Sequence, residues 1–395
     1  MQKYLKFSLV FILAIALVAV GTIGCGGGAK EEKEAYKIGA IFSTSGTQSD
    51  LGVPEENTVK MIEDQVNANG GINGHPLDVI IYNDESDATK ANTLATKLIE
   101  QDQVLAIIGP TTTGSTLAIN STVTAAEIPL VSCAAGATII DPVQHWIFKT
   151  PQTDKQVVYE LYTYLRDQGI TKVAIITATS GFGTGGRGYL ISEAAEFGIT
   201  IVDDQTFASS DTSMVSQLTH IKGTDAQAVV CWDTSQASAV VAQDMKTLHF
   251  EIPLFCSHGI ANKTFINAAG DAANDVIFPA GKLLIVGNIS ASDPQKEALT
   301  SYKDEYETLY GAGTASTFGG HAWDALEMVT LALKDLPEGV SLQQARTDIR
   351  DSIEGITNFV GISGIFTMSS TDHLGMQPGS LALIEIVGGM WVPAQ

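Results

Sequence analysis

Positive charge, cysteine and aromatic residues are all scarce in this chain of 395 residues. Lysine and arginine together number 22 against 44 aspartates and glutamates, so the formal net charge is −22. Such an acidic chain is poorly suited to phosphate backbones, which argues against nucleic acid as a partner. Hydrophobic residues make up 45% of the chain, which is enough for one large core or two.

The four cysteines do not form a recognisable framework. Apart from Cys25, near the N-terminus, the chain has three cysteines, an odd number: Cys133, Cys231 and Cys256. Cys231 and Cys256 lie inside apolar, strand-like runs. We therefore expect buried thiols rather than disulfides. No spacing of cysteine and histidine matches a metal site, and we expect neither a metal nor a cofactor.

The motifs of a hydrolase are missing as well. The chain has no Gly-x-Ser-x-Gly elbow, and only two of its seven histidines are placed for a site. His258 directly follows a predicted strand, and His321 stands at the start of a predicted helix. The alternative for both is a capping or core histidine. The sequence therefore gives no support for a hydrolase.

One long apolar run is present, at the N-terminus. Two lysines precede the apolar residues 7–20, and small residues lead up to Cys25. The pattern predicts a secretory signal peptide over residues 1–24, with a run too short for a comfortable transmembrane span. Cleavage before Cys25 resembles bacterial lipoprotein processing. We expect a lipid anchor on Cys25, a linker over residues 25–35, and a location outside the cytoplasm, on the outer face of the cell membrane or in the periplasm. A plain secreted protein is the alternative.

From Tyr36 onward, short apolar runs alternate with helical patterns. Such alternation predicts an α/β fold in which parallel sheets are covered on both faces and ligands bind beyond the carboxyl ends of the strands. Strands are expected at residues 37–42, 77–82, 104–109, 129–132, 172–178, 199–203, 228–232, 254–257, 365–368 and 381–387. Helices are expected at residues 54–67, 88–100, from 115, and at 157–167, 188–196, 214–222, 238–248, 295–310, 322–336 and 342–352.

The alternation pauses at residues 150–154 and then restarts, which predicts two lobes of similar size. The late helices and strands are too few for a third domain, so we expect them to complete the two sheets already begun. Lobe 1 is then residues 36–152 and 281–376, and lobe 2 is residues 153–280 and 377–395. The chain would cross between the lobes more than once.

Residues 104–118 form the stretch on which the functional interpretation depends. An apolar run ends at Gly109-Pro110, three threonines and a glycine follow, and a helix is expected from Ser115. The start of a helix presents backbone N–H groups and the positive end of its dipole, and here threonine hydroxyls lie beside them. This suits a small anion such as a carboxylate. The alternative is a plain Gly/Thr-rich turn between a strand and a helix.

A second glycine-rich stretch, residues 181–186, satisfies the dinucleotide motif G-x-G-x-x-G. We expect it to form a loop, with Asp203 and Asp204 ending the next strand where a ribose-binding acid would stand. An NAD-binding oxidoreductase is therefore a rival interpretation. Two residues separate the first glycine from the strand, however, and an exported protein lies away from nicotinamide pools. Phe182 in this loop and Trp232 at a strand exit favour a ligand face instead.

Five short motifs follow one another along the chain. They are Tyr36-Lys-Ile-Gly, Asn69-Gly-Gly-Ile-Asn-Gly74, Ile108-Gly-Pro-Thr-Thr-Thr-Gly114, Ile128-Pro-Leu-Val-Ser132 and Ser257-His-Gly-Ile-Ala-Asn262. In this order they resemble the type I solute-binding proteins of branched-chain amino acid ABC importers, and the likeness runs from Tyr36 to Trp391. The resemblance implies two Rossmann-like lobes that are joined by three crossovers and close over a ligand, without catalysis.

The resemblance also implies ligand-binding residues. Thr113 lies where the family holds the ligand carboxylate, and Ala134 where a backbone group contacts the ligand. Gly136 stands where the family usually has a hydroxyl, and Phe182 replaces a common tyrosine. Thr234 falls where a second aromatic residue often sits, and the neighbouring Trp232 is expected to fill that space. Secondary candidates are Thr112, Ser45 and His321.

His258 falls where the amino acid binders place a carboxylate against the ligand ammonium. A histidine supplies no negative charge, and a buried ammonium beside it would lack a counter-charge. The expected ligand is a small carboxylate, either a branched-chain amino acid or a related organic or aromatic acid, and His258 favours the acids.

We therefore expect a monomeric, lipid-anchored solute-binding protein that hands a small carboxylate to the membrane permease of an ABC importer. A ligand-sensing receptor module of the same fold is the alternative, and no signalling segment accompanies it here.

Overall fold

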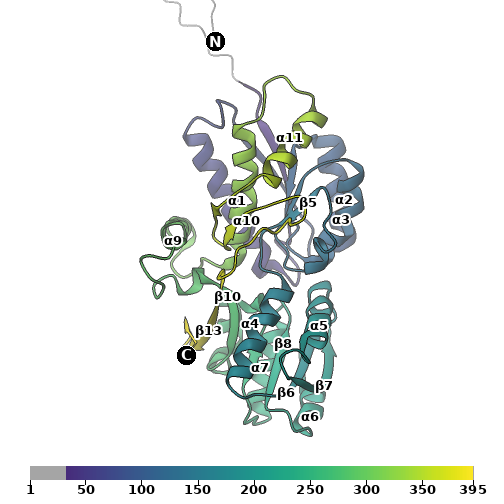
Figure 1. Ribbon diagram of the computed structural model, residues 1–395, viewed down its shortest axis with the longest axis vertical. Coiled ribbons are helices and arrows are strands. Elements are labelled where there is room, and N and C mark those ends of the chain that lie inside the picture. The colour runs from purple at the N-terminus through teal and green to yellow at the C-terminus, as the bar shows by residue number, and fades with distance from the viewer. Residues whose placement is uncertain (1–32, 395) are drawn as a thin grey trace, which may run out of the picture. The chain divides into compact units, whose positions relative to one another are not determined.

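The computed structural model describes residues 33–394. From Glu34 onward these residues form one compact unit, drawn in Figure 1. The predicted signal peptide and Cys25 lie outside the described residues. Within residues 33–394, no helix combines the length and the apolar character needed to cross a membrane.

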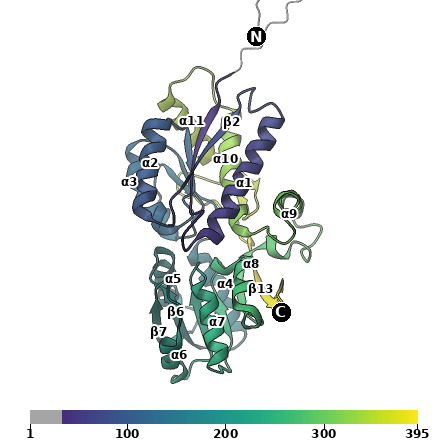
Figure 2. The same cartoon turned by 180° about the vertical axis from the view of Figure 1, so that it is seen from behind.

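The first sheet has five parallel strands in the order β2-β1-β3-β4-β5. Parallel strands with helices on both faces are buried throughout, and β3, β4 and β5 have no exposed residue. Seen from behind, α2 packs beside α3 and α1 beside α10 (Figure 2). The strands are β1 (Tyr36–Phe42), β2 (Leu77–Asn83), β3 (Ala106–Ile108), β4 (Leu130–Ser132) and β5 (Ile147–Lys149). The helices are α1 (Ser49–Ala68), α2 (Ala88–Lys97), α3 (Thr113–Ala125), α10 (Thr317–Lys334) and α11 (Leu342–Glu354).

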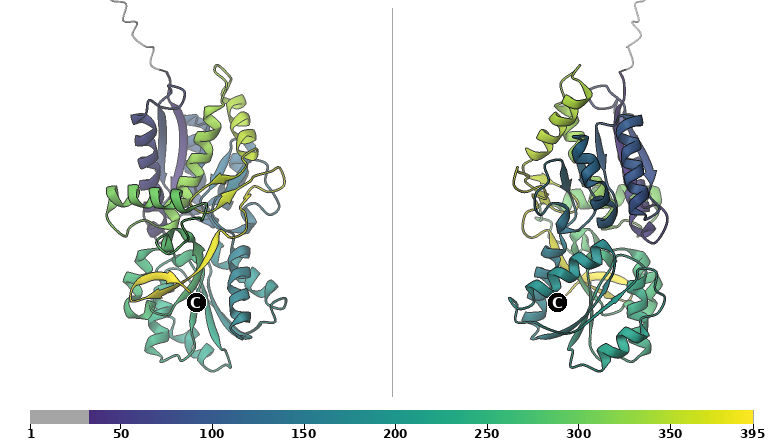
Figure 3. Two further views of the ribbon diagram at one scale, coloured as in Figure 1. Left: turned by 60° about the vertical axis from the view of Figure 1, so that its left-hand side comes forward. Right: turned by 90° about the vertical axis from the view of Figure 1, so that its right-hand side faces the viewer.

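The second sheet has seven strands in the order β14-β13-β10-β9-β8-β6-β7. Five are parallel, and β13 and β14 form an antiparallel hairpin at one edge, drawn in yellow in Figure 3. The strands are β6 (Lys172–Ala178), β7 (Thr200–Phe207), β8 (Ala228–Trp232), β9 (Leu254–Cys256), β10 (Ile277–Gly281), β13 (Leu381–Val387) and β14 (Met390–Pro393). The helices are α4 (Asp154–Asp167), α5 (Gly181–Glu193), α6 (Val215–Lys222), α7 (Ala237–Thr247) and α8 (Lys263–Ala269).

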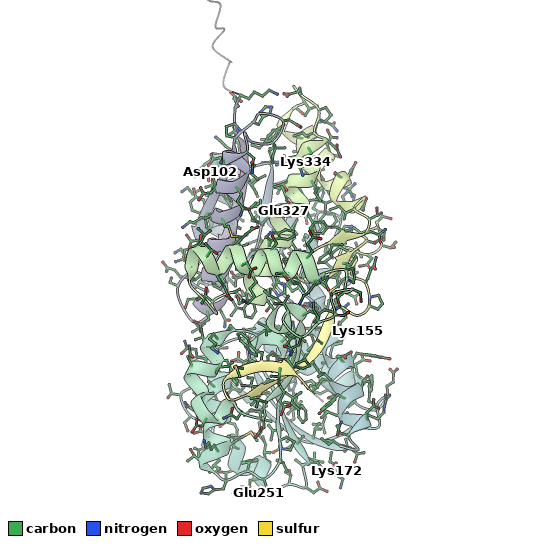
Figure 4. All side chains as sticks on the ribbon, turned by 90° about the vertical axis from the view of Figure 1, so that its left-hand side faces the viewer. Asp102, Lys155, Lys172, Glu251, Glu327 and Lys334 are labelled. Carbon is green, nitrogen blue, oxygen red and sulfur yellow. The ribbon has the colours of Figure 1, made fainter. Side chains whose placement is uncertain are left out.

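Side chains of the second sheet point alternately to its two faces, as the pleat of a strand requires. On β6, Ala174 and Ile176 belong to the core shared with α6, α7 and α8, whereas Val173 and Ile175 belong to the core shared with α4 and α5. Charged side chains such as Lys155, Lys172 and Glu251 lie on the outer surface (Figure 4).

The chain passes between the two sheets three times, after β5, after β10 and after the small hairpin of β11 (Phe359–Val360) and β12 (Ile365–Phe366). The first two passages are bonded to the turn of this hairpin, which precedes the third. Gln152 Nε2 donates to the carbonyl of Ser363 at 2.6 Å, and Gln295 Nε2 donates to that of Gly361 at 2.9 Å. The Asp324 carboxylate of α10 accepts from the Ser363 N–H at 2.7 Å. Helix α9 (Lys296–Tyr310) packs its tyrosines against α1 after the second passage.

The predicted α/β class with two sheet-based lobes is confirmed, but the structure corrects several local predictions. Residues 181–186 are not a loop, because α5 begins at Gly181. The short strand β5, the strands β10 and β14 and the helix α8 were not predicted from the sequence. Of the late strands, β13 joins the second sheet, whereas β12 pairs with β11 and joins neither large sheet. The residue limits of the lobes stay a prediction.

Candidate functional site

A cavity of about 220 Å³ lies where loops from both sheets meet. Its wall comes from segments that follow the carboxyl ends of all five strands of the first sheet and of β6, β7, β8 and β9 in the second, together with the start of α10. Parallel α/β sheets place ligands at this end of their strands. Thr112, Thr113, Phe182, Thr234, His258 and His321 from the sequence prediction all line it, and Ser45, Ala134, Gly136 and Trp232 do not.

The end of the cavity that the sequence predicts to bind an anion is the start of α3. Thr112 is the N-cap residue, and its hydroxyl accepts from the Ser115 N–H at 3.1 Å. The first N–H groups of a helix have no partner inside it, so those of Thr113 and Gly114 are available to an anion. Thr113 is 2% exposed. Helix α3 has 13 residues, long enough for its dipole to favour a negative charge here.

Gly136 acts on the cavity through Thr113. Its N–H donates to Thr113 Oγ1 at 3.2 Å, which leaves the hydroxyl proton of Thr113 free to point at a ligand. A Cβ on Gly136 would stand 2.4 Å from Thr113 Cγ2, so only glycine allows this close approach. The hydroxyl expected at position 136 would occupy the space that Thr113 already fills. Ala134 is buried beside the cavity, between the lining residues Cys133 and Ala135.

An aromatic group forms the opposite wall. The Phe182 ring lies 5.8 Å from that of Trp232, nearly parallel to it, and 5.4 Å from that of His258 in an edge-on arrangement. Trp232 is fully buried and supports Phe182 and His258 from behind. A Cβ on Gly186 would stand 2.0 Å from Trp232 Nε1, so this glycine is required by packing within α5.

Hydrogen bonds at the start of α5 and along β7 weaken the dinucleotide-binding interpretation of residues 181–186. Ser180 is the N-cap residue of α5, and its hydroxyl accepts from the Gly183 N–H at 3.1 Å. Asp203 and Asp204 lie within β7 rather than at its end. Arg187 Nε donates to Asp204 Oδ1 at 2.8 Å, and Asp203 bonds to His220 at 2.6 Å, so both carboxylates are already engaged.

Two neutral histidines complete the wall. Burial lowers the pKa of His258 to about 3; the positive charge of Lys149 acts in the same direction, and the backbone of Gln152 opposes it. His258 is 4% exposed, and neither ring nitrogen makes a hydrogen bond to the described residues. His321 Nδ1 contacts Ser363 Oγ at 2.7 Å, and burial lowers its pKa well below the ordinary value.

No aspartate, glutamate, lysine or arginine stands among the described residues that line the cavity. Charged residues lie behind the wall, among them Glu55 and Lys149, which bond to the lining residues Thr111 and Pro151. Glu55 is fully buried, accepts from the Thr111 hydroxyl, and has a pKa raised well above its ordinary value by burial. Lys149 donates to the Pro151 carbonyl at 2.5 Å, and burial lowers its pKa to about 7, against the opposing charge of Asp154. The cavity therefore offers an ammonium group no direct counter-charge.

Gln48 is one of several lining residues that were not predicted from the sequence. It is 6% exposed and lies in the polar stretch between the strand expected at residues 37–42 and the helix expected at residues 54–67. Helix α1 in fact begins within that stretch, at Ser49. The sequence feature that could have identified Gln48 as a lining residue is its position just after the carboxyl end of β1.

Comparisons with known proteins agree with this geometry. Two α/β sheets with a cavity at their carboxyl ends define the class of type I periplasmic binding proteins. A family model described as "Periplasmic binding protein" matches residues 35–389, and the chain belongs to this family. The resemblance to solute-binding proteins and the expected fold class are thereby confirmed.

Individual relatives are distant in sequence and similar in structure. The chain is 24% identical to the Leu/Ile/Val-binding protein homolog 8 of Brucella abortus over 294 residues, which covers 71% of this chain and 72% of that one. An extracellular ligand-binding receptor from Rhodopseudomonas palustris HaA2 is 26% identical, with a TM-score of 0.85 over 91% of this chain and 99% of that one. The LivJ protein of Streptococcus pneumoniae, solved with isoleucine, is 24% identical, with a TM-score of 0.79 over the same shares of the two chains.

The neutral state of His258 predicts a pH-dependent stability. In the unfolded chain the His258 ring has a pKa near 6.5, so below that pH the unfolded chain binds a proton while the buried native ring stays neutral. The free energy of unfolding therefore decreases as the pH is lowered. We expect the parent protein to lose about 2 to 3 kcal/mol more than His258→Phe between pH 6.5 and 4.5, by urea unfolding. Comparing the pH slopes cancels the other titrating groups, and equal slopes would show that His258 is not buried and neutral.

Proposed function

We propose that this protein binds a small carboxylate in the cavity, outside the cytoplasm, and delivers it to the permease of an ABC importer. The observation that carries the proposal is the start of α3, where Thr113 and unpaired backbone N–H groups line a cavity without acidic side chains. Thr113 would hold the carboxylate, and Thr112, Thr234 and His321 would contact the rest of the ligand.

The ligand we propose is a branched-chain or aromatic carboxylic acid rather than an α-amino acid. The absence of acidic residues from the described lining supports this choice, because a buried ammonium without a counter-charge costs several kcal/mol. Phe182, supported by Trp232, would pack against the flat or apolar body of the ligand, and His258 would face its far end.

The transport role includes an anchor and a movement. We propose that the mature chain is a monomer attached through a lipid on Cys25, and that the lobes, residues 36–152 with 281–376 and residues 153–280 with 377–395, close over the ligand as hinged halves. The bonded passages around Gln152 and Ser363 support a hinge at this place. The proposed role is binding, without chemistry.

Thr113→Ala tests the proposal directly. A thermal-shift screen of amino acids and organic acids first identifies ligands, since a ligand at about 100 times its dissociation constant stabilises by about 2.7 kcal/mol. We expect Thr113→Ala to weaken a carboxylate ligand by about 10- to 100-fold, because hydrogen bonds to charged groups contribute about 1.5 to 3 kcal/mol. The melting temperature of the empty protein should stay nearly unchanged. An equal loss for ligands without a carboxylate would contradict the role of Thr113.

A further inference from the structure

Gln48 is held in the cavity wall by its backbone, not by its side chain. Its N–H donates to Ser86 Oγ at 3.1 Å, and its carbonyl accepts from the Leu51 N–H at 3.0 Å. Gln48 takes the N-cap position of α1, yet its side chain makes no cap hydrogen bond. The side chain is therefore not used to begin the helix.

The side-chain oxygen of Gln48 is buried without a partner. Gln48 is 6% exposed, and its Oε1 makes no hydrogen bond to the described residues. Leaving a buried acceptor unpaired costs about 1 to 3 kcal/mol, so such a group calls for a specific explanation. Other polar residues of the same wall are paired: the Thr111 hydroxyl donates to Glu55, and the Ser115 hydroxyl donates to Asp84 Oδ2 at 2.8 Å.

His258 offers the cavity a second acceptor from the other sheet. A neutral imidazole carries one N–H donor and one bare nitrogen that accepts. Both ring nitrogens of His258 lack a partner among the described residues, so the neutral ring offers one acceptor nitrogen in either tautomer. Gln48 and His258 both line the cavity, so two unpaired acceptors serve the same space.

We infer that the ligand carries, besides its carboxylate, a neutral hydrogen-bond donor that pairs with Gln48 Oε1, and that Gln48 is a specificity-determining residue for hydroxylated carboxylic acids. The inference rests on the proposed function, since it adds a hydroxyl to the proposed carboxylate. A hydroxyl suits the site because it donates to an acceptor without bringing a charge. An ammonium would also donate, but no described lining residue neutralises it.

Calorimetry with ligand-stripped, refolded protein tests this with acids that differ by one group. The probes are benzoate against 3- and 4-hydroxybenzoate, and 4-methylpentanoate against 2-hydroxy-4-methylpentanoate and leucine. In at least one set we expect the hydroxylated acid to bind about tenfold more tightly than its parent acid, which corresponds to about 1.4 kcal/mol. Gln48→Leu and Gln48→Met should each reduce this ratio to about twofold or less; the ratio is the readout, because it cancels any change in the affinity that both acids share. Gln65→Leu, at an exposed position of α1, is the matched control and should keep the ratio.

The possible outcomes distinguish a failure of the inference about Gln48 from a failure of the proposed function. If the carboxylates bind but no hydroxylated acid is preferred, or if the preference persists in both Gln48 variants, the inference is wrong and the proposed function stands. A preference for leucine over both of its analogues would also overturn the inference. If no carboxylate binds at all, the proposed function itself is wrong. Two variants are used so that a folding defect in one does not leave the question open.

Discussion

His258→Glu is expected to give the protein an affinity for leucine at least 100-fold above that of the parent. The substitution places a carboxylate in a wall whose described lining residues include no acid. A desolvated ion pair that replaces an unpaired buried ammonium is worth about 3 kcal/mol or more, which corresponds to a factor of more than 100. Lys149 lies behind the wall and does not line the cavity, so we expect the new carboxylate to face the ligand.

The measurement is a calorimetric titration of leucine and of 4-methylpentanoate into ligand-stripped parent and variant. The acid without the amino group should lose affinity in His258→Glu, because two carboxylates would then share the cavity. His258→Gln is the matched control, since it keeps a neutral polar side chain and should gain no affinity for leucine. If circular dichroism shows that His258→Glu is folded and the variant gains no affinity for leucine, the ligand ammonium would not lie beside position 258.

Gly136→Ala is expected to weaken carboxylate binding at least tenfold without unfolding the protein. The added Cβ would stand 2.4 Å from Thr113 Cγ2 and 2.9 Å from its hydroxyl oxygen, so the threonine side chain must turn away. Gly136 has φ −53°, which alanine adopts without strain, and therefore the backbone has no reason to move. The lost affinity should approach that of Thr113→Ala, because both changes remove the same hydroxyl.

A double-mutant cycle tests whether the effect of Gly136→Ala on binding depends on Thr113. In the Thr113→Ala background, Gly136→Ala should cost little further affinity, since the side chain that it displaces is gone. Gly188→Ala is a suitable control, because a Cβ there meets no atom within 4 Å. Independent, additive losses at positions 113 and 136 would mean that Gly136 contacts the ligand itself and does not act through Thr113.

The larger elements were predictable because burial leaves a strong pattern in the sequence. Strands β6, β8 and β13 have the predicted limits, and the first two are near-continuous apolar runs, as central parallel strands are. Strand β5 was missed because it has only three residues and ends in Lys149, a charged residue that its fully buried position does not suggest. Strand β10 contains Pro279 and ends at Gly281, both of which argue locally against a strand.

Tertiary contacts explain the remaining differences between the elements predicted from the sequence and those in the structure. Glycine favours loops, so residues 181–186 were expected to be one, yet α5 begins at Gly181, and position 186 is a glycine because Trp232 leaves no room for a side chain. In the site, Thr113, Phe182 and His258 were identified from their places at strand exits and from the family pattern, and all three line the cavity. Their contacts with a ligand stay a prediction.

Gln48 was missed because a glutamine in a polar stretch is ordinary at a protein surface. Only the approach of segments distant in the sequence, among them Ser86 and the start of α3, buries it. Trp232 was expected to touch the ligand and instead supports the aromatic wall, a distinction that depends on side-chain packing and is invisible in a strand pattern.

The buried Lys149 sets the electrostatic balance behind the cavity. Burial lowers its pKa, the charge of Asp154 opposes that shift, and the charge of Lys149 contributes to the low pKa of both His258 and His321. An anion bound in the cavity, as the proposed function requires, would favour the charged form of Lys149, so we expect carboxylate binding to tighten as the pH is lowered through the range in which this group titrates.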